Sequence, residues 1–272
     1  MIAPSDLTFV AALCLARAGL KVNTDKAYLI DSRLAPVARR EGYDSPEDFI
    51  TALRNRGDAR QAWAAVEAMV LPEPEFFRDR ALFDALADRV MPDLAHARGG
   101  EPVRVWSAAC GTGQEVYSLA MRLAEAPALA GQVDLFASDL SERSLEKAQA
   151  GLYSQFEVQR GLSARNLVRH FEKSGEAFVL SPRIRQMVRW RRVNLMDDLT
   201  RLGQFDLLLC RGLLGQLAPE AREKVLAQLQ GALAPGGRLV LGLKDVAGDR
   251  FDRLAPELGL HGAPGEAVRS AA

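Results

Sequence analysis

The chain has 272 residues, 48% of them hydrophobic, which suits one large domain or a small domain plus a medium one. Lysine plus arginine and aspartate plus glutamate are equal at 35 each, so net charge does not indicate a nucleic-acid-binding protein. No run approaches the roughly 18 to 20 apolar residues of a membrane span, and the N-terminus is not typical of a signal peptide. We therefore expect a cytoplasmic protein without membrane insertion.

Cysteine and histidine give no sign of metal or nucleophilic chemistry. Cys14, Cys110 and Cys210 and the three histidines are scattered, with no metal-ligand spacing and no Ser-His-Asp pattern. We expect no metal site, and we expect the cysteines to be small buried side chains in a reducing compartment.

Helical periodicity dominates the N-terminal quarter of the chain. Apolar residues recur at helical spacing over 7–18 and stop at Gly19, which is typical of a helix C-cap. Further helices are predicted before residue 70, among them one over 45–53 that begins with a capping serine and a proline. We predict a helical domain over residues 1–70.

A second domain is predicted over residues 71–272. Two prolines break the helical run after Leu71, and a helix is predicted from 76 to 96. Strands and helices then alternate, and the strands are almost wholly apolar, as in a parallel sheet buried on both faces. They cover 103–108, 133–138, 188–193, 205–210 and 238–242. Alternation lapses over 151–182, where we expect a small subdomain with a hairpin arm. The predicted fold class is α/β, a helical bundle followed by a Rossmann-like domain.

The turn after the first predicted strand is rich in small residues. Gly111 and Gly113 carry no side chain, so backbone amides can approach a ligand at the start of the helix that begins near Gln114. Asp139 ends the second strand, where an acidic residue binds the ribose hydroxyls of a nucleoside cofactor. These features predict an enzyme with a nucleoside cofactor.

Two cofactors use this architecture, a dinucleotide and S-adenosylmethionine. The dinucleotide fingerprint requires a third glycine, which is absent after Gly113. Glu115 would oppose a pyrophosphate, whereas the cationic ammonium and sulfonium of S-adenosylmethionine favour a carboxylate. The sequence therefore favours S-adenosylmethionine.

Several motifs occur in order along the chain. They are Phe76-Phe-Arg-Asp79, Trp106-Ser-Ala-Ala-Cys-Gly-Thr-Gly-Gln-Glu115, Tyr117–Met121, Ser138-Asp139, Gly151-x-Tyr153, Asn194-Leu195, and Phe205-Asp206 through Cys210-Arg211. This series resembles the chemotaxis receptor methyltransferases of the CheR type, over nearly the whole chain. The resemblance implies an S-adenosylmethionine-dependent methyltransferase domain that methylates glutamate side chains on a chemoreceptor's cytoplasmic helices.

The resemblance also implies roles for single residues. Arg78 would be catalytic, facing both the methionyl end of the cofactor and the incoming carboxylate. The other implied cofactor contacts are Gly111, Glu115, Asp139 for the ribose, Asn194 and Leu195 for the adenine, and Cys210 and Arg211 along the pocket. The alternatives are a surface arginine at 78, a solvated carboxylate at 115, a helix cap at 139 and a turn residue at 194.

The acceptor side departs from the family pattern. Where the family has Asn-Glu-Thr before Phe-Phe-Arg, this chain has Pro72 and Pro74, and a usual asparagine and tyrosine are replaced by Gly212 and Gln216. Removal of one well-placed donor can cost on the order of 10² in rate. Two readings therefore stand beside the receptor methyltransferase. One is a catalytically silent or weak module that binds S-adenosylmethionine and docks on receptors, and the other is a methyltransferase with another acceptor.

The N-terminal helical domain is locally basic. We expect an acidic face of a receptor helix to meet its arginines, although a solvated helical face also explains such charges. The candidates are Arg33, Arg39, Arg40 and Arg54.

Overall fold

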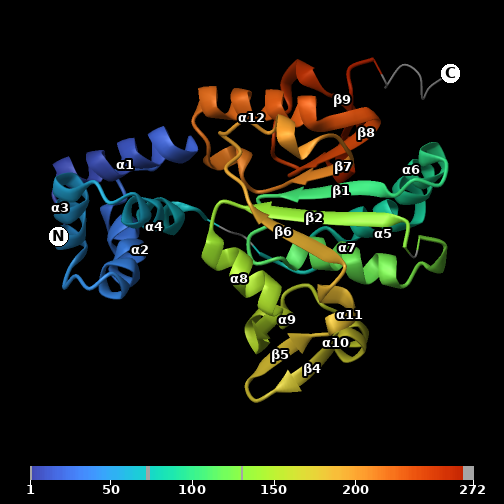
Figure 1. Cartoon of the computed structure of the whole chain (residues 1–272), viewed down its shortest axis with the longest axis horizontal. Coiled ribbons are helices and arrows are strands. Elements are labelled where there is room, and N and C mark those ends of the chain that lie inside the picture. Colours follow the sequence, from blue (N-terminus) through green and yellow to red (C-terminus); the bar gives the residue numbers. More distant parts are fainter. Residues whose placement is uncertain (1, 72–73, 130, 266–272) are drawn as a thin grey trace. The chain divides into compact units, whose positions relative to one another are not determined.

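A computed structural model describes residues 2–71, 74–129 and 131–265. The chain divides into two compact units (Figure 1). One unit comprises Met1–Leu71 and Leu214–Val225, and the other comprises Pro72–Leu213 and Leu226–Ala272. The limits predicted from the sequence, 1–70 and 71–272, stay a prediction.

The N-terminal unit is helical, as predicted. Its helices are α1 (Pro4–Ala18), α2 (Ala27–Arg40), α3 (Pro46–Arg56) and α4 (Ala59–Met69). Helix α1 ends at Gly19, whose left-handed backbone (φ 66°) lets its N–H bond the carbonyl of Leu15. Helix α3 begins after Ser45, whose side chain accepts a hydrogen bond of 3.1 Å from the amide of Asp48. Both predicted caps are confirmed.

A distant segment completes this unit. Leu217 forms an isolated antiparallel bridge with Leu20, and the amide of Ala218 bonds the carbonyl of Gly19 at 2.8 Å. The side-chain amide of Gln216 pairs with the backbone of Leu71 in both directions, accepting from its N–H at 2.8 Å and donating to its carbonyl at 2.9 Å. Gln216 therefore closes the end of the helical unit.

The second unit is built on a seven-stranded sheet in the order β6-β2-β1-β7-β8-β10-β9 (Figure 1). Its strands are β1 (Val103–Ala108), β2 (Val133–Asp139), β6 (Val188–Arg192), β7 (Phe205–Cys210), β8 (Leu233–Leu241), β9 (Asp252–Ala255) and β10 (Leu260–Gly262). The first five in spatial order are parallel, and β10 is antiparallel to both neighbours. All six residues of β7 are buried. The predicted α/β class with a parallel sheet is confirmed, whereas β9 and β10 were not predicted because neither has a strand pattern.

The helices of this region precede β1 or lie between later strands in the sequence, and the first part of the last helix, up to Val225, belongs to the helical unit. They are α5 (Arg80–Ala85), a π-helical stretch (Leu86–Val90), α6 (Met91–Arg98), α7 (Gln114–Ala124), α8 (Glu142–Ala150) and α12 (Pro219–Ala232). The prediction that a helix begins at residue 76 is wrong. Phe77 and Asp79 have left-handed backbones (φ 50° and 60°), so the chain turns twice before α5 begins.

Residues 151–182 carry a small antiparallel sheet of their own, in the order β3-β5-β4. The elements are β3 (Leu152–Ser154), α9 (Gln155–Gln159), α10 (Ala164–His170), β4 (Phe171–Ser174), β5 (Ala177–Leu180) and α11 (Pro182–Arg185). The expected hairpin arm corresponds to β4 and β5.

Candidate active site

Most of the predicted site residues follow the carboxyl ends of neighbouring parallel strands. β1 lies between β2 and β7 in the sheet, and these strands end at Ala108, Asp139 and Cys210. The chain continues from β1 to β2 on one side and enters β7 on the other, so the direction of winding changes here. Such a switch point is where ligands bind in open parallel sheets.

The turn between β1 and α7 is held in a left-handed conformation at three positions. Ala109, Gly111 and Gly113 have φ values of 54°, 55° and 92°. A methyl group at Gly113 would lie 3.0 Å from Cβ of Ala148 and 3.1 Å from Trp190. This position therefore requires glycine both for its left-handed backbone and for lack of space. The turn is therefore fixed by the packing of α7 against its surroundings.

Asp139 is joined to this turn. Its carboxylate accepts a hydrogen bond of 2.8 Å from the amide of Gly111 and one of 2.9 Å from the amide of Ser141. The residue is 6% exposed, and burial raises the pKa of its carboxyl above the ordinary value of 3.8. Ser141, not Asp139, caps α8, because its hydroxyl accepts the amide of Ser144. The backbone amides of Gly111, Leu140 and Ser141 thus hold this carboxylate, which has about four acceptor sites in all.

Glu115 belongs to a cluster of charges at the start of α7. Nη1 of Arg211 donates to its Oε2 at 2.8 Å, and Nη2 of Arg211 donates to the carboxylate of Asp79. Burial raises the pKa of the Glu115 carboxyl, while the positive charges of Arg211 and Arg78 act in the opposite direction. Glu115 is thus a paired carboxylate, and the alternative of a solvated one does not describe it.

The two residues that precede Arg78 anchor its segment, one by ring packing and the other by a hydrogen bond to α7. Phe76 is fully buried, with its ring 5.0 Å from that of Tyr153 and 5.6 Å from that of Phe171. The amide of Phe77 donates to the hydroxyl of Ser118 on α7 at 2.8 Å. The Arg78 side chain itself is exposed.

Two tyrosines from the sequence motifs hold the turn between β1 and α7 and the helix that follows it. The Tyr153 hydroxyl donates to the carbonyl of Thr112 at 2.7 Å, and the Tyr117 hydroxyl donates to the carbonyl of Ala148 at 2.7 Å. The first bond holds the turn directly, and the second holds α7, which follows the turn, against α8. The sequence reasoning assigned no role to Tyr153, Ser118 or Asp79. For Asp79, the available signal was an acidic residue directly after the arginine of the Phe-Phe-Arg motif.

The remaining predicted residues line the neighbouring strand ends. Asn194 follows β6, and its side-chain oxygen accepts from the amide of Met196 at 3.1 Å, so it does form the turn proposed as its alternative role. Leu195 is buried, and its carbonyl accepts from Gln228 at 2.8 Å. Cys210 is fully buried, and burial raises the pKa of its thiol, which excludes it as a nucleophile at neutral pH.

The departures on the acceptor side have local structural explanations. Gly212 has a left-handed backbone with φ 78°, and nothing lies within 4 Å of a methyl group added there. Glycine and asparagine are the residues that adopt this conformation readily, so their exchange keeps the turn. Gln216 belongs to the helical unit, where it holds Leu71. Pro74 is half-buried, and Pro72 lies outside the described residues.

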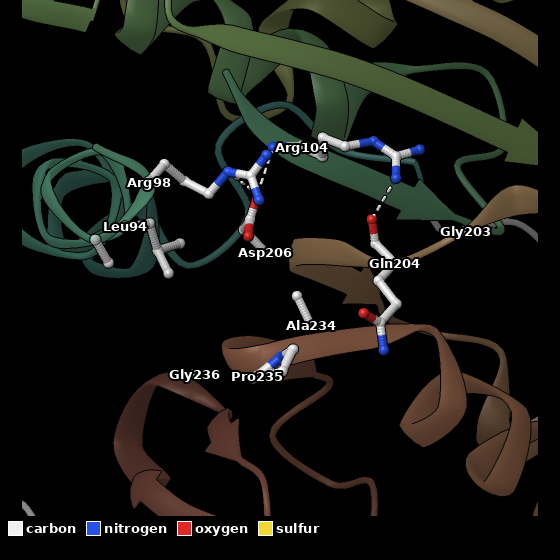
Figure 2. A pocket seen from close by; sticks show the side chains of 10 residues that line it. Leu94, Arg98, Arg104, Gly203, Gln204, Asp206, Ala234, Pro235 and Gly236 are labelled. Carbon is white, nitrogen blue, oxygen red and sulfur yellow. Dashed lines mark hydrogen bonds and ion pairs between the residues drawn. The ribbon is translucent and has the colours of Figure 1, made fainter. Parts of the chain in front are cut away.

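A cavity of about 610 Å³ lies at the opposite end of the same strands (Figure 2). Asp206, the second residue of β7, accepts from the amide of Arg104 at 2.8 Å and lies 3.7 Å from Nε of Arg98. The Arg104 guanidinium donates to the carbonyls of Gln204 and Leu202. The cavity lies at the amino ends of the strands and is therefore distinct from the candidate cofactor site at their carboxyl ends.

In the described ranges 2–71, 74–129 and 131–265, no three His, Cys, Asp or Glu side chains are grouped so that they could hold a metal ion. Within the same ranges, no helix is long and apolar enough to cross a membrane.

The site fits one kind of cofactor. The glycine-containing turn after β1, the Asp139 carboxylate at the end of β2 and the Glu115 carboxylate at the start of α7 match a nucleoside that carries ribose hydroxyls and an ammonium group. The fold and this donor set define an S-adenosylmethionine-dependent methyltransferase. The chain belongs to the CheR methyltransferase family. Residues 73–254 match its S-adenosylmethionine-binding domain, and residues 5–68 match its all-alpha domain.

Curated relatives agree with this assignment. The chain is 37% identical over 234 residues to chemotaxis protein methyltransferase 1 of Pseudomonas aeruginosa, covering 84% of this chain and 85% of the relative. It is 36% identical over 238 residues to a chemotaxis protein methyltransferase of Vibrio parahaemolyticus, covering 85% of each chain. The sequence-based prediction of the family, the enzyme class and the cofactor is confirmed.

Proposed function

We propose that this enzyme transfers the methyl group of S-adenosylmethionine to glutamate side chains on the cytoplasmic helices of a chemoreceptor. The observation that carries the proposal is the charge cluster at the carboxyl ends of β1 and β7. There the exposed Arg78 lies beside Arg211 and Glu115, so a carboxylate can be received next to a nucleoside site. The names of the relatives support a chemotaxis role, and a receptor whose modified helices face the cytoplasm requires the enzyme there.

The site residues divide the cofactor between them. Asp139 would accept the ribose hydroxyls, and Glu115 would accept the ammonium of the methionyl group. The loop after β6, with Asn194 and Leu195, would contact the adenine, and Gly111, Cys210 and Arg211 would line the pocket. Bound S-adenosylmethionine supplies an electrophilic methyl carbon on its sulfonium.

The reaction requires no proton transfer. A glutamate carboxylate is ionised at neutral pH, and its oxygen forms the new bond to the methyl carbon as the carbon–sulfur bond breaks. The products are a methyl ester and neutral S-adenosylhomocysteine. The protein must hold the acceptor oxygen in line with that bond and exclude water. Arg78 would perform the first task by pairing with the acceptor carboxylate.

The partner surface is proposed on the helical unit. Arg54 bonds the carbonyl of Ser5 and pairs with Asp6, and Arg40 pairs with Glu41, so these two arginines already have partners. Arg39 is exposed and Arg33 half-buried on α2. Arg33 and Arg39 would meet the acidic face of a receptor helix.

The test is transfer of radiolabelled methyl groups from S-adenosylmethionine to a purified cytoplasmic receptor fragment. Label that is released by mild base is expected, because methyl esters hydrolyse under those conditions. The control is the same fragment with its acceptor glutamates replaced by alanine. Label that persists in that control, or that resists base, would contradict the glutamate acceptor.

Charge reversal at Arg33 and Arg39 tests the partner surface. It should raise the KM for the receptor fragment and make that KM less dependent on salt concentration.

A further inference from the structure

The described residues contain three non-glycine residues with a left-handed backbone, Phe77, Asp79 and Ala109. Ala109 lies in the cofactor turn, and the other two flank Arg78. Backbone strain of this kind persists only where the surrounding structure enforces it, and it concentrates at functional sites. The strain at Phe77 is held by its bond to Ser118 on α7.

The left-handed turn at Asp79 has a clear geometric result. It directs the Asp79 carboxylate onto Nη2 of Arg211, while Nη1 of Arg211 donates to Glu115 at 2.8 Å and to the carbonyl of Arg78 at 3.4 Å. The Arg211 side chain is only 8% exposed. A buried guanidinium needs its charge compensated, and its planar fork can bridge two carboxylates, which a lysine cannot do in the same way.

We propose that Asp79 is a positioning residue that fixes Arg211 against Glu115 and so sets the Glu115 carboxylate for the cofactor. Arg211 is then a structural cation, already shared by two carboxylates, and the acceptor is left to Arg78. The inference rests on the proposed role of Glu115 toward the cofactor ammonium.

The first experiment compares binding of S-adenosylhomocysteine by calorimetry in the parent and in Asp79→Asn. Asparagine adopts the left-handed conformation readily, so this change removes the charge and keeps the turn. We expect an affinity about tenfold weaker, the effect of losing one charge-assisted hydrogen bond. The matched control is Asp88→Asn, which removes another carboxylate bonded to an arginine, Arg122, at 3.1 Å. Its affinity should equal that of the parent.

Two further measurements separate positioning from a general loss of structure. In an Arg211→Ala background, Asp79→Asn should cause no additional loss, because Asp79 acts through Arg211. Glu115 also faces Arg211, Arg78 and Asp79, so the acid limb of the affinity profile reports on where Arg211 lies. If Asp79→Asn releases Arg211, that limb moves to higher pH.

The outcomes are distinct. A parent that fails to bind S-adenosylhomocysteine would contradict the cofactor pocket itself. A parent that binds, with Asp79→Asn equal to it, would overturn this inference alone. An acid limb that moves to lower pH would also overturn it, since Arg211 would then have stayed beside Glu115. If Asp79→Asn does not fold, Arg211→Lys tests the same bridge from the other side and should show the same tenfold loss.

Discussion

Charged clusters lie at both ends of the same parallel strands, and they are built differently. At the amino ends, Asp206 accepts from the Arg104 amide and pairs with Arg98, while the Arg104 guanidinium donates to backbone carbonyls beside a cavity (Figure 2). At the carboxyl ends, Asp139 at the end of β2 and Glu115 in the first turn of α7 adjoin a turn in which Ala109, Gly111 and Gly113 have left-handed backbones.

A cavity lined with charged side chains therefore does not by itself define a functional site. At the amino ends, the left-handed residues that line the cavity are glycines, Gly203 and Gly236, which adopt that conformation without strain, and the Asp206 carboxylate is used by the fold. At the carboxyl ends, three non-glycine residues, Phe77, Asp79 and Ala109, adopt the left-handed conformation. Position at the winding reversal and strained backbone distinguish the functional end.

The largest effect is expected from Asp139→Ala. The change removes the ribose acceptor and also frees the Gly111 amide that fixes the turn. Affinity for S-adenosylhomocysteine should fall at least about 100-fold, roughly the sum of two lost hydrogen bonds to a charged group. Calorimetry measures this directly. An unchanged affinity would place the cofactor elsewhere.

An intermediate effect is expected from pH at Glu115. Its pKa lies above the ordinary value of 4.5 because of burial, so on acidification it is protonated earlier than a solvated glutamate. Protonation removes its attraction for the cofactor ammonium, and affinity should therefore fall as pH decreases toward and through that raised pKa. Glu115→Gln should bind more weakly at neutral pH and show a flatter profile. An identical acid limb in both proteins would exclude Glu115 as its cause.

The smallest effect on binding is expected at the amino ends. Asp206→Ala leaves the Arg104 amide without its acceptor, which should lower the free energy of unfolding by about 1–3 kcal/mol. Affinity for S-adenosylhomocysteine should stay within about twofold of the parent. Urea unfolding and calorimetry check the two parts. A large loss of affinity with unchanged stability would place the cofactor site at the amino ends of the strands instead.

Much of this fold could be predicted because its signals are local. β1 and β7 were predicted with their observed bounds, since buried parallel strands are continuous apolar runs between turn residues. The Ser45 cap and the Gly19 cap were equally local. The short strands β9 and β10 depend on pairing with β8, and nothing in their own residues indicates it.

The charge cluster was predictable only in part. Glu115 and Arg211 were each predicted as a cofactor contact. The hydrogen bond between them was not predicted, because it joins residues 96 positions apart and depends on β1 and β7 being neighbours in the sheet. The helix predicted from residue 76 begins only at Arg80, because Phe77 adopts a left-handed backbone that its residue type disfavours and Asp79 adopts one that aspartate tolerates better. At Phe77 that conformation is fixed by the hydrogen bond that its amide donates to the Ser118 hydroxyl, a tertiary contact with no signature in the local sequence.

The pairing of Gln216 with Leu71 bears on how the chain can be divided. The helical unit consists of two stretches, so the polypeptide leaves it after Leu71, returns at Leu214 and leaves again after Val225. A protease cut between the first stretch and the second unit would therefore not release a free fragment, because residues 214–225 stay covalently attached to the other unit while holding Leu71 and Gly19. Recombination that exchanges one contiguous block of this gene would likewise exchange an incomplete unit.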